Sequence, residues 1–216
     1  MPWTQAGAVV VVVAHQFNPS VFSQTWLVRN ELLAEADFMP GSVFTDLIVQ
    51  VHSRQFNMLV ISEQLQFFPN VARAEEQALI VDKMSRIVRT LPHTPFKALG
   101  LNFCWHLQPR EGDIGRTTRG LFYRDRNPLY QQFAADDAHF GGYLSKNVFG
   151  FRLKLDVKPI LIATTGGQPE GRVQFSFNFH VDLDDNGAQQ ITEHLVRWNE
   201  VRQEAERIID SVEPRG

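Results

Sequence analysis

The stretch that decides the fold is RVQFSFNFHVDLDDNGAQQITEHL, residues 172–195. Every second residue from Val173 to Leu183 is apolar, and three of these six residues are phenylalanine. Alternation with period two is typical of a β-strand with one buried face. Burial of each such side chain contributes about 1.5–3 kcal/mol, so a register shift by one residue is strongly disfavoured. The pattern then changes to helical spacing, which predicts a strand followed by a helix.

The polar face of this strand carries Asn178, His180 and Asp182. A histidine and an aspartate two residues apart on a strand have neighbouring side chains, which can bind a metal or share a proton. That chemistry needs a third group, and a paired strand over residues 101–107 would offer Asn102, Cys104 and His106. The interpretation that we favour is a face in contact with solvent or a partner, with no metal and no cofactor.

The rest of the chain divides into alternating and helical patterns. Residues 43–68 predict two or three antiparallel strands, and residues 99–107 predict another. Residues 71–91 and 185–212 carry apolar residues at helical spacing, which predicts two long amphipathic helices. Together these patterns predict an α+β fold, with a largely antiparallel sheet and both helices packed on one of its faces.

Three details of these elements bear on packing. The five valines of residues 9–13 are β-branched on both faces, which predicts a central strand covered on both sides. A turn is predicted near Lys158 and Pro159, and Arg202 interrupts the apolar stripe of the terminal helix. In the helix over residues 71–91, Glu75 and Glu76 are placed outside an apolar stripe that is predicted to contain Ala74, Ala78, Val81, Met84, Val88 and Leu91.

The domain organisation is predicted as a single domain over residues 1–216. LNFCWHL at residues 101–107 matches FNFHVDL at residues 177–183 at an Asn, a Phe and a Leu. This similarity raises the alternative of two related halves, about residues 1–107 and 121–216, although strand composition alone can produce it.

An arginine-rich and glycine-rich segment, residues 110–126, joins the two halves. Pro109 and Pro128 flank its glycines, which predicts a long surface loop. Arg116, Arg119 and Arg124 lie there with aromatic residues, a combination that suits phosphate contact and base stacking. No Gly-Lys-Ser/Thr follows the glycines and no helix is indicated, so the segment is not a P-loop. A salt-bridged loop and a protein-docking loop are the alternatives.

Composition restricts the class of protein. The 216 residues are long enough for a core that needs no disulfide or metal, and a net charge of −3 lacks the positive field that sequence-independent nucleic-acid binding uses. Cys104 is the single cysteine, which excludes an intramolecular disulfide and favours a cytoplasmic location. The apolar run at residues 6–14 is too short for a bilayer helix, so we expect no membrane span.

Cys104 and His106 admit a second interpretation as a nucleophile and its base. Side chains two apart on one strand point in parallel rather than toward each other. A small, half-buried thiol is therefore the interpretation that we favour.

The ending FNFHVDL followed by an amphipathic helix resembles a loose group of uncharacterised bacterial proteins of similar size. The resemblance covers mainly residues 43–107 and 173–212. It implies no established activity. It implies an accessory role, because such proteins are often encoded beside mobile-element or phage-defence genes.

These observations predict a non-catalytic binding or regulatory component of a bacterial protein assembly, associated with phage defence. Its partner is expected to be a protein that contacts the polar sheet face and the arginine-rich segment. The alternative is a nucleic-acid-processing or metal-dependent enzyme that uses His180 and Asp182, with residues 110–126 holding phosphate.

Overall fold

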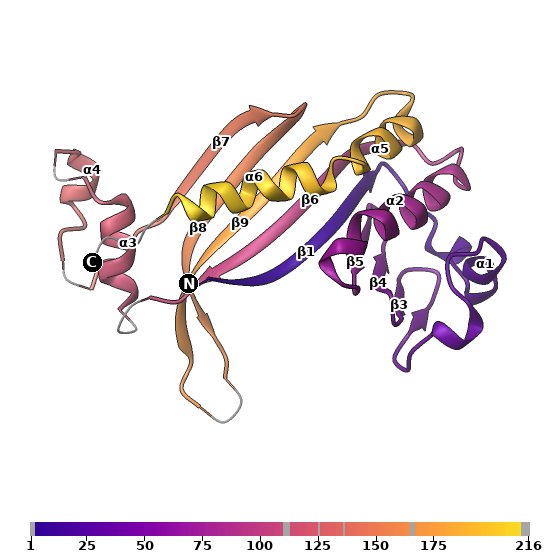
Figure 1. The fold of residues 1–216 in the computed structure, drawn as a ribbon, viewed down its shortest axis with the longest axis horizontal. Helices are drawn as coiled ribbons and strands as arrows, with labels where there is room; N and C mark the ends of the chain where they lie inside the picture. Colours follow the sequence, from indigo (N-terminus) through magenta and orange to yellow (C-terminus); the bar gives the residue numbers. More distant parts are fainter. Residues whose placement is uncertain (1–2, 110–112, 125, 136, 165–166, 213–216) are drawn as a thin grey trace. The chain divides into compact units, whose positions relative to one another are not determined.

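The structure, a computed structural model, describes residues 3–109, 113–124, 126–135, 137–164 and 167–212 (Figure 1). The helices are α1 (Gln24–Arg29), α2 (Arg73–Arg89), α3 (Ile114–Phe122), α4 (Pro128–Gln131), α5 (Gly187–Leu195) and α6 (Trp198–Asp210). The strands are β1 (Trp3–Ala14), β2 (Val43–Phe44), β3 (Val49–His52), β4 (Phe56–Val60), β5 (Gln64–Pro69), β6 (Phe96–Leu107), β7 (Gly142–Val148), β8 (Phe151–Ile162) and β9 (Glu170–Asp182).

The strand order among the described residues is β2-β3-β4-β5-β1-β6-β9-β8-β7, and the sheet is antiparallel. The strand predicted from residues 173–183 is β9, and its neighbour β6 is the strand predicted from residues 99–107. The predicted α+β class with an antiparallel sheet is therefore confirmed.

The chain forms two compact units that each draw on several segments. Unit 1 contains residues 1–7, 103–178 and 204–216, and unit 2 contains residues 8–102 and 179–203. Strands β1, β6 and β9 and helix α6 thus contribute to both units. The units do not follow the predicted halves, and a relationship between those halves stays a prediction.

The core of unit 1 is built on the phenylalanines of β9. Phe175 and Phe177 are at most 2% exposed. Phe175 makes an edge contact with Trp3 at 4.9 Å between ring centroids, and Phe177 makes one with Trp105 at 5.5 Å. Such edge-to-face pairs add to the stabilisation from area burial. The alternation of apolar residues in the sequence therefore accounts for this layer of buried aromatic side chains in unit 1.

An ion-paired carboxylate ties the end of α6 to β7 in unit 1. Glu204 lies between Lys146, at 2.5 Å, and Arg207, at 2.7 Å, and its side chain is only 9% exposed. Its hydrogen bonds with Arg207 and then with Lys146 lower the pKa of Glu204 to about 2, against the opposing effect of burial. The carboxylate is therefore charged throughout the neutral range.

The core of unit 2 lies between its strands and α2. Phe56 and Phe67 stack at 4.6 Å between centroids. The predicted helical stripe is partly wrong, because Ala74 and Ala78 are exposed. The buried side of α2 is instead set by its larger apolar residues, which gain more from burial than alanine does: Ile80, Met84, Ile87 and Val88.

A buried polar network joins α2 to α6 within unit 2. Glu76, predicted to lie outside the stripe, is 8% exposed, and Arg202 is 3% exposed. The Trp198 indole N–H donates to Glu76 Oε2 at 3.1 Å, and Arg202 forms an ion pair with the same oxygen. The arginine that interrupts the terminal helical stripe therefore has its charge balanced inside the core.

The single long helix predicted over residues 185–212 is two helices, α5 and α6, separated by Val196 and Arg197. Ile191 and Leu195 on α5 and Trp198 on α6 are fully buried, so the apolar periodicity continues across the break. That continuity explains why the sequence pattern does not reveal the interruption.

One turn was not predicted from the sequence, and another differs from its predicted place. The alternating run from Val43 is interrupted by a β2–β3 turn, in which the Thr45 hydroxyl accepts the Ile48 N–H at 3.1 Å and Leu47 is 82% exposed. The β7–β8 turn lies at Phe149 and Gly150, which have φ of 52° and 80°. Positive φ at both central residues is typical of a tight hairpin turn, and glycine adopts it without strain.

The turn predicted near Lys158 and Pro159 is wrong, because β8 continues to Ile162. Its neighbour β7 ends its pairing at Gly142 opposite Val157. Pro159 therefore lies beyond that paired stretch, where the missing N–H costs no hydrogen bond to β7.

Candidate functional site

On one face of the unit 2 sheet, the outward side chains of β1, β3, β4 and β5 remain half-buried or exposed. On β1, Val10 and Val12 are at most 1% exposed, whereas Val9, Val11 and Val13 are only half-buried. The predicted cover on both sides of this strand is therefore wrong. Helices α2 and α5 cover one side, and the valines of the other side reach solvent.

The outward residues of β1, β3, β4 and β5 form what we call the open face. Strand register places Val11 beside Gln66, Gln66 beside Leu59, and Leu59 beside Gln50. None of the ten outward residues of these strands within unit 2 is Asp, Glu, Lys or Arg. They are Val9, Val11, Val13, Gln50, His52, Asn57, Leu59, Gln64, Gln66 and Phe68.

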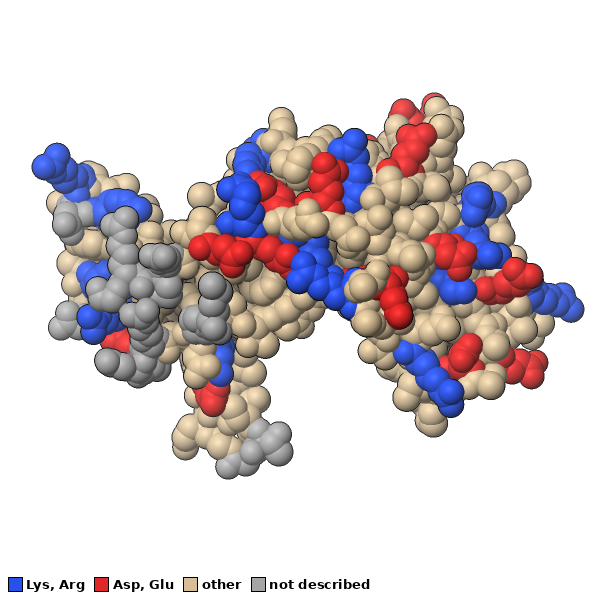
Figure 2. Space-filling view, in the orientation of Figure 1, with Lys and Arg blue, Asp and Glu red and all other residues tan. Residues whose placement is uncertain are grey.

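The helices differ from the open face in charge. Figure 2 shows basic and acidic side chains interspersed over the helices. On α2, Asp82 pairs with Lys83 at 3.2 Å and with Arg86 at 2.7 Å. The open face thus lacks the mixed charge that usually keeps a protein surface solvated.

The predicted polar ladder is only partly brought together. Nε2 of His180 lies 3.2 Å from Oδ1 of Asp182, with side-chain exposures of 28% and 88%. Both residues belong to unit 2, whereas the half-buried Asn178 belongs to unit 1. Among the described residues, no group of three His, Cys, Asp or Glu side chains could hold a metal ion. The His–Asp pair is open to solvent.

Cys104 is half-buried in unit 1, and its side chain hydrogen-bonds with Ser176 of the neighbouring strand. Burial raises the pKa of the Cys104 thiol above its usual value, and the Ser176 contact and the charge of Lys158 oppose this only in part. A raised pKa disfavours the thiolate that a nucleophile needs. This environment agrees with the half-buried thiol that the sequence favours.

The predicted loop contains a helix, α3, so the expectation of no helix there is wrong. Asp113 caps it by accepting the Arg116 N–H at 2.8 Å. An aspartate at this position accepts a hydrogen bond from an N–H group of the first turn that has no partner within the helix. This capping signal in the sequence was missed. Arg110, Glu111 and Asp125 lie outside the described residues.

The three candidate arginines of this segment differ in role. Arg119 donates to the carbonyl of Ala135 at 2.6 Å, and its guanidinium lies over the rings of Tyr123, at 4.9 Å, and Phe140, at 5.3 Å. Arg116 and Arg124 are exposed. Arg119 therefore holds α3 to the following loop, and only the other two present their charge to solvent.

The arginine-rich segment has a small positive charge. Residues 110–126 contain five arginines and the acidic residues Glu111, Asp113 and Asp125, so their formal net charge is 5 − 3 = +2. Asp136 and Asp137 follow in the sequence, and residues 110–137 together sum to zero. Phosphate binding relies on an excess of basic groups, and this excess is small.

We predict that Arg119→Ala lowers the free energy of unfolding by about 1–2 kcal/mol, because it removes a cation–π contact and a hydrogen bond to a carbonyl. The matched change Arg116→Ala should stay within about 0.5 kcal/mol of the wild type, since Arg116 is exposed. Urea denaturation of both variants measures the difference. Equal losses would contradict the assignment.

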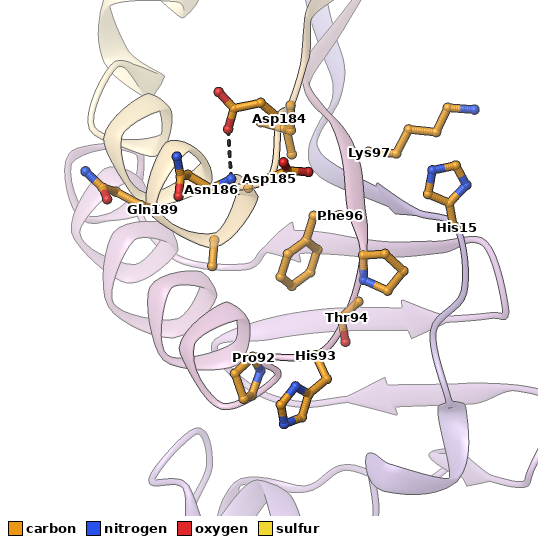
Figure 3. Close-up of a pocket in the computed structure, with 14 residues that line it drawn as sticks. His15, Pro92, His93, Thr94, Phe96, Lys97, Asp184, Asp185, Asn186 and Gln189 are labelled. Carbon is orange, nitrogen blue, oxygen red and sulfur yellow. Dashed lines mark hydrogen bonds between the residues drawn. The ribbon is translucent and has the colours of Figure 1, made fainter.

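A pocket of about 580 Å³ lies at one end of the strands of unit 2 (Figure 3). We call it the polar pocket. The end of β1 contributes His15, the start of β6 contributes Lys97, and the link between β9 and α5 contributes Asp184 and Asp185. His93 from the α2–β6 link completes its charged and titratable lining.

Backbone contacts build this pocket. The His15 N–H donates to the Pro95 carbonyl at 3.0 Å, and the Asn186 N–H donates to Asp184 Oδ1 at 2.8 Å (Figure 3). Gly187 packs on Phe96, where an added Cβ would lie 2.9 Å from the Phe96 Cβ. Only glycine allows this close approach at the start of α5.

Sequence reasoning did not find the polar pocket, because its walls come from distant segments. Volumes of 300–1,000 Å³ are typical of ligand sites, but such sites usually enclose their ligand. Here His15, Lys97 and Asp185 are all exposed. The pocket is better described as an open surface depression.

Comparison of the chain with protein-family models, with curated proteins and with solved structures finds no match. The resemblance to bacterial accessory proteins therefore stays a prediction. Among the described helices, none meets the length and hydropathy requirements of a membrane-spanning segment.

Proposed function

We propose that the protein is a non-catalytic binding component of a bacterial protein assembly in the cytoplasm, and that the open face of unit 2 binds a protein partner. The single observation that carries this proposal is the valine run of β1. Val9, Val11 and Val13 have the composition of a buried strand but are half-buried. A protein partner would complete their burial.

The chemistry of the open face favours a protein over other ligands. With no Lys or Arg among its ten residues, the face has no group that would neutralise phosphate, so nucleic acid is disfavoured. None of its ten residues lines a cavity described in the structure, whereas small molecules are bound in clefts. Depletion of charge is typical of the core of a protein interface.

The half-buried amides on the face suit the same role. Gln64 and Gln66 flank the valines through the β1–β5 register, with Val13 opposite Gln64 and Val11 opposite Gln66. Glutamine side chains can donate and accept hydrogen bonds, so they would orient a partner packed on the valines. A phage-defence assembly is the setting that we propose, by the resemblance noted above.

The test uses the full chain as bait in a lysate of its source organism, followed by purification of the retained protein. We predict that Gln66→Arg weakens the measured Kd for this partner at least about tenfold, because an unpaired charge is desolvated in the interface. Gln64→Arg should act similarly. Gln203→Arg, on the exposed side of α6, is the matched control and should leave the Kd unchanged.

Hydrogen exchange of the purified complex adds a second measurement. Binding should slow exchange in β1 and β5. A partner whose Kd is the same for Gln66→Arg and Gln203→Arg, with protection elsewhere in the chain, would refute the proposal.

A further inference from the structure

A second depression of unit 2, the apolar groove, shares a wall with the polar pocket. Its volume is about 660 Å³, and residues 92–95 of the α2–β6 link line both cavities. Its other walls are the segment after β1, which includes Phe17 and Pro19, and the β2–β3 turn with Asp46 and Leu47.

The groove has walls of mixed polarity that are restricted by prolines. Pro19, Pro92 and Pro95 limit the backbone on two sides, so little ordering is needed when a ligand enters. Phe17 and Pro19 are buried and support the wall from within, whereas other apolar lining residues are at least partly exposed: Val21, Leu47, Leu91, Pro92 and Pro95. The groove therefore offers these five apolar side chains to a ligand, beside polar lining residues.

Leu47 is the feature that marks the groove as a contact site. It is 82% exposed, the largest value among the exposed large hydrophobic side chains described, and it lines the groove. The Thr45 hydroxyl accepts the N–H groups of Leu47 and Ile48 at 3.4 and 3.1 Å, which holds the turn in this conformation. A large apolar side chain is thus presented to solvent by an ordered turn.

The charges that line the two cavities indicate which charged group a ligand should carry. Asp46 lines the groove, and Asp184, Asp185 and Lys97 line the polar pocket. With His15 and His93 neutral, their formal sum is 1 − 3 = −2. One oxygen of Asp184 accepts the Asn186 N–H, but the exposed Asp185 faces solvent. A cationic group complements this balance.

We propose that the apolar groove and the polar pocket together bind an extended peptide segment of a protein partner, in which a large apolar residue lies close to a Lys or Arg. Residues 92–95 line both cavities, and residues of an extended peptide follow one another at about 3.3 Å, so two residues close together in the sequence of a peptide can enter the two adjoining cavities. The inference rests on the proposed function, because it takes the partner to be a protein, but it assigns a site separate from the open face.

The experiment selects a phage-displayed library of random heptapeptides on the full chain. Enriched peptides should pair a large apolar residue with a Lys or Arg within three positions. For a synthetic enriched peptide, fluorescence anisotropy should show at least about tenfold weaker binding to Leu47→Asp. Leu47 is so exposed that this change leaves the fold intact.

Charge variants distinguish the contribution of the polar pocket to peptide binding from that of the apolar groove. The double variant Asp184→Asn, Asp185→Asn should bind the peptide about threefold to tenfold more weakly than the wild type does. It should also bind the peptide and its Lys→Met or Arg→Met analogue with the same affinity. Gln66→Arg on the open face is the matched control and should bind the peptide as the wild type does.

Three outcomes would overturn the inference: no enriched peptide, enrichment without a basic residue, or equal binding to Leu47→Asp and wild type. Each of them leaves the open-face proposal standing, since that proposal is tested by Gln66→Arg against the purified partner. Conversely, a partner insensitive to Gln66→Arg refutes the open face without affecting the peptide result.

Discussion

Glu76→Ala is expected to lower the free energy of unfolding by about 3–5 kcal/mol. The change leaves the guanidinium of Arg202, 3% exposed, without its carboxylate, and it removes the acceptor of the Trp198 indole N–H. An uncompensated charge in the core is much more costly than the loss of the ion pair itself. Urea denaturation followed by tryptophan fluorescence measures the loss.

Two variants control this prediction. Glu75→Ala, next to Glu76 but exposed in the first turn of α2, should cost no more than about 1 kcal/mol. The double variant Glu76→Leu, Arg202→Met should recover most of the stability, because it removes both charges and keeps the volume filled. If Glu76→Ala costs no more than Glu75→Ala, the network does not stabilise unit 2.

Phe177→Ala is expected to cost about 3–5 kcal/mol. Phe177 is 1% exposed and contacts the Trp105 ring edge-on, so its removal leaves a cavity in the core of unit 1. The loss combines the transfer free energy of the ring with the cost of the unfilled space. Denaturant unfolding measures it, and near-ultraviolet circular dichroism should report the altered packing of Trp105.

The matched control for this variant is Leu161→Ala on β8. Leu161 is also a large apolar residue of a unit 1 strand, but it is 72% exposed. Its replacement should change the free energy of unfolding by about 0.5 kcal/mol or less. Similar effects of the two changes would show that the phenylalanine layer does not anchor the strand.

The strands were predictable because their signal is local. Burial on one face of β9 requires apolar residues at every second position, and Val173, Phe175 and Phe177 satisfy that rule without reference to the rest of the chain. The β2–β3 turn escaped prediction because Val43, Leu47 and Val49 fit the same alternation. Only the hydrogen bonds of Thr45 show that Leu47 leaves the strand.

The polar network could not be predicted, because its members are far apart in the sequence. Glu76 and Arg202 are separated by 126 residues, and each alone resembles an ordinary charged residue on a helix. The polar pocket has the same origin, since strand ends bring His15 and Lys97 beside the start of α5. Local periodicity carries no information on which residues far apart in the sequence come into contact.

The contacts of the candidate site residues could be predicted only in part from the sequence. His180 and Asp182 do contact each other, as neighbouring positions on one strand face predict. Arg119 was grouped with two exposed arginines because composition does not distinguish an arginine stacked on aromatic rings from a solvated one. The open face was not predicted, because the composition of the valine run indicates burial on both sides of the strand, whereas Val9, Val11 and Val13 are only half-buried.

The half-buried valines of β1 have a consequence for aggregation of the protein in the cell. The open face carries aliphatic and amide side chains without Asp, Glu, Lys or Arg, and a net charge of only −3 provides little repulsion between copies of the chain. If the proposed partner covers this face, chains made in excess of it would tend to aggregate, and balanced synthesis or rapid proteolysis of the excess would prevent this.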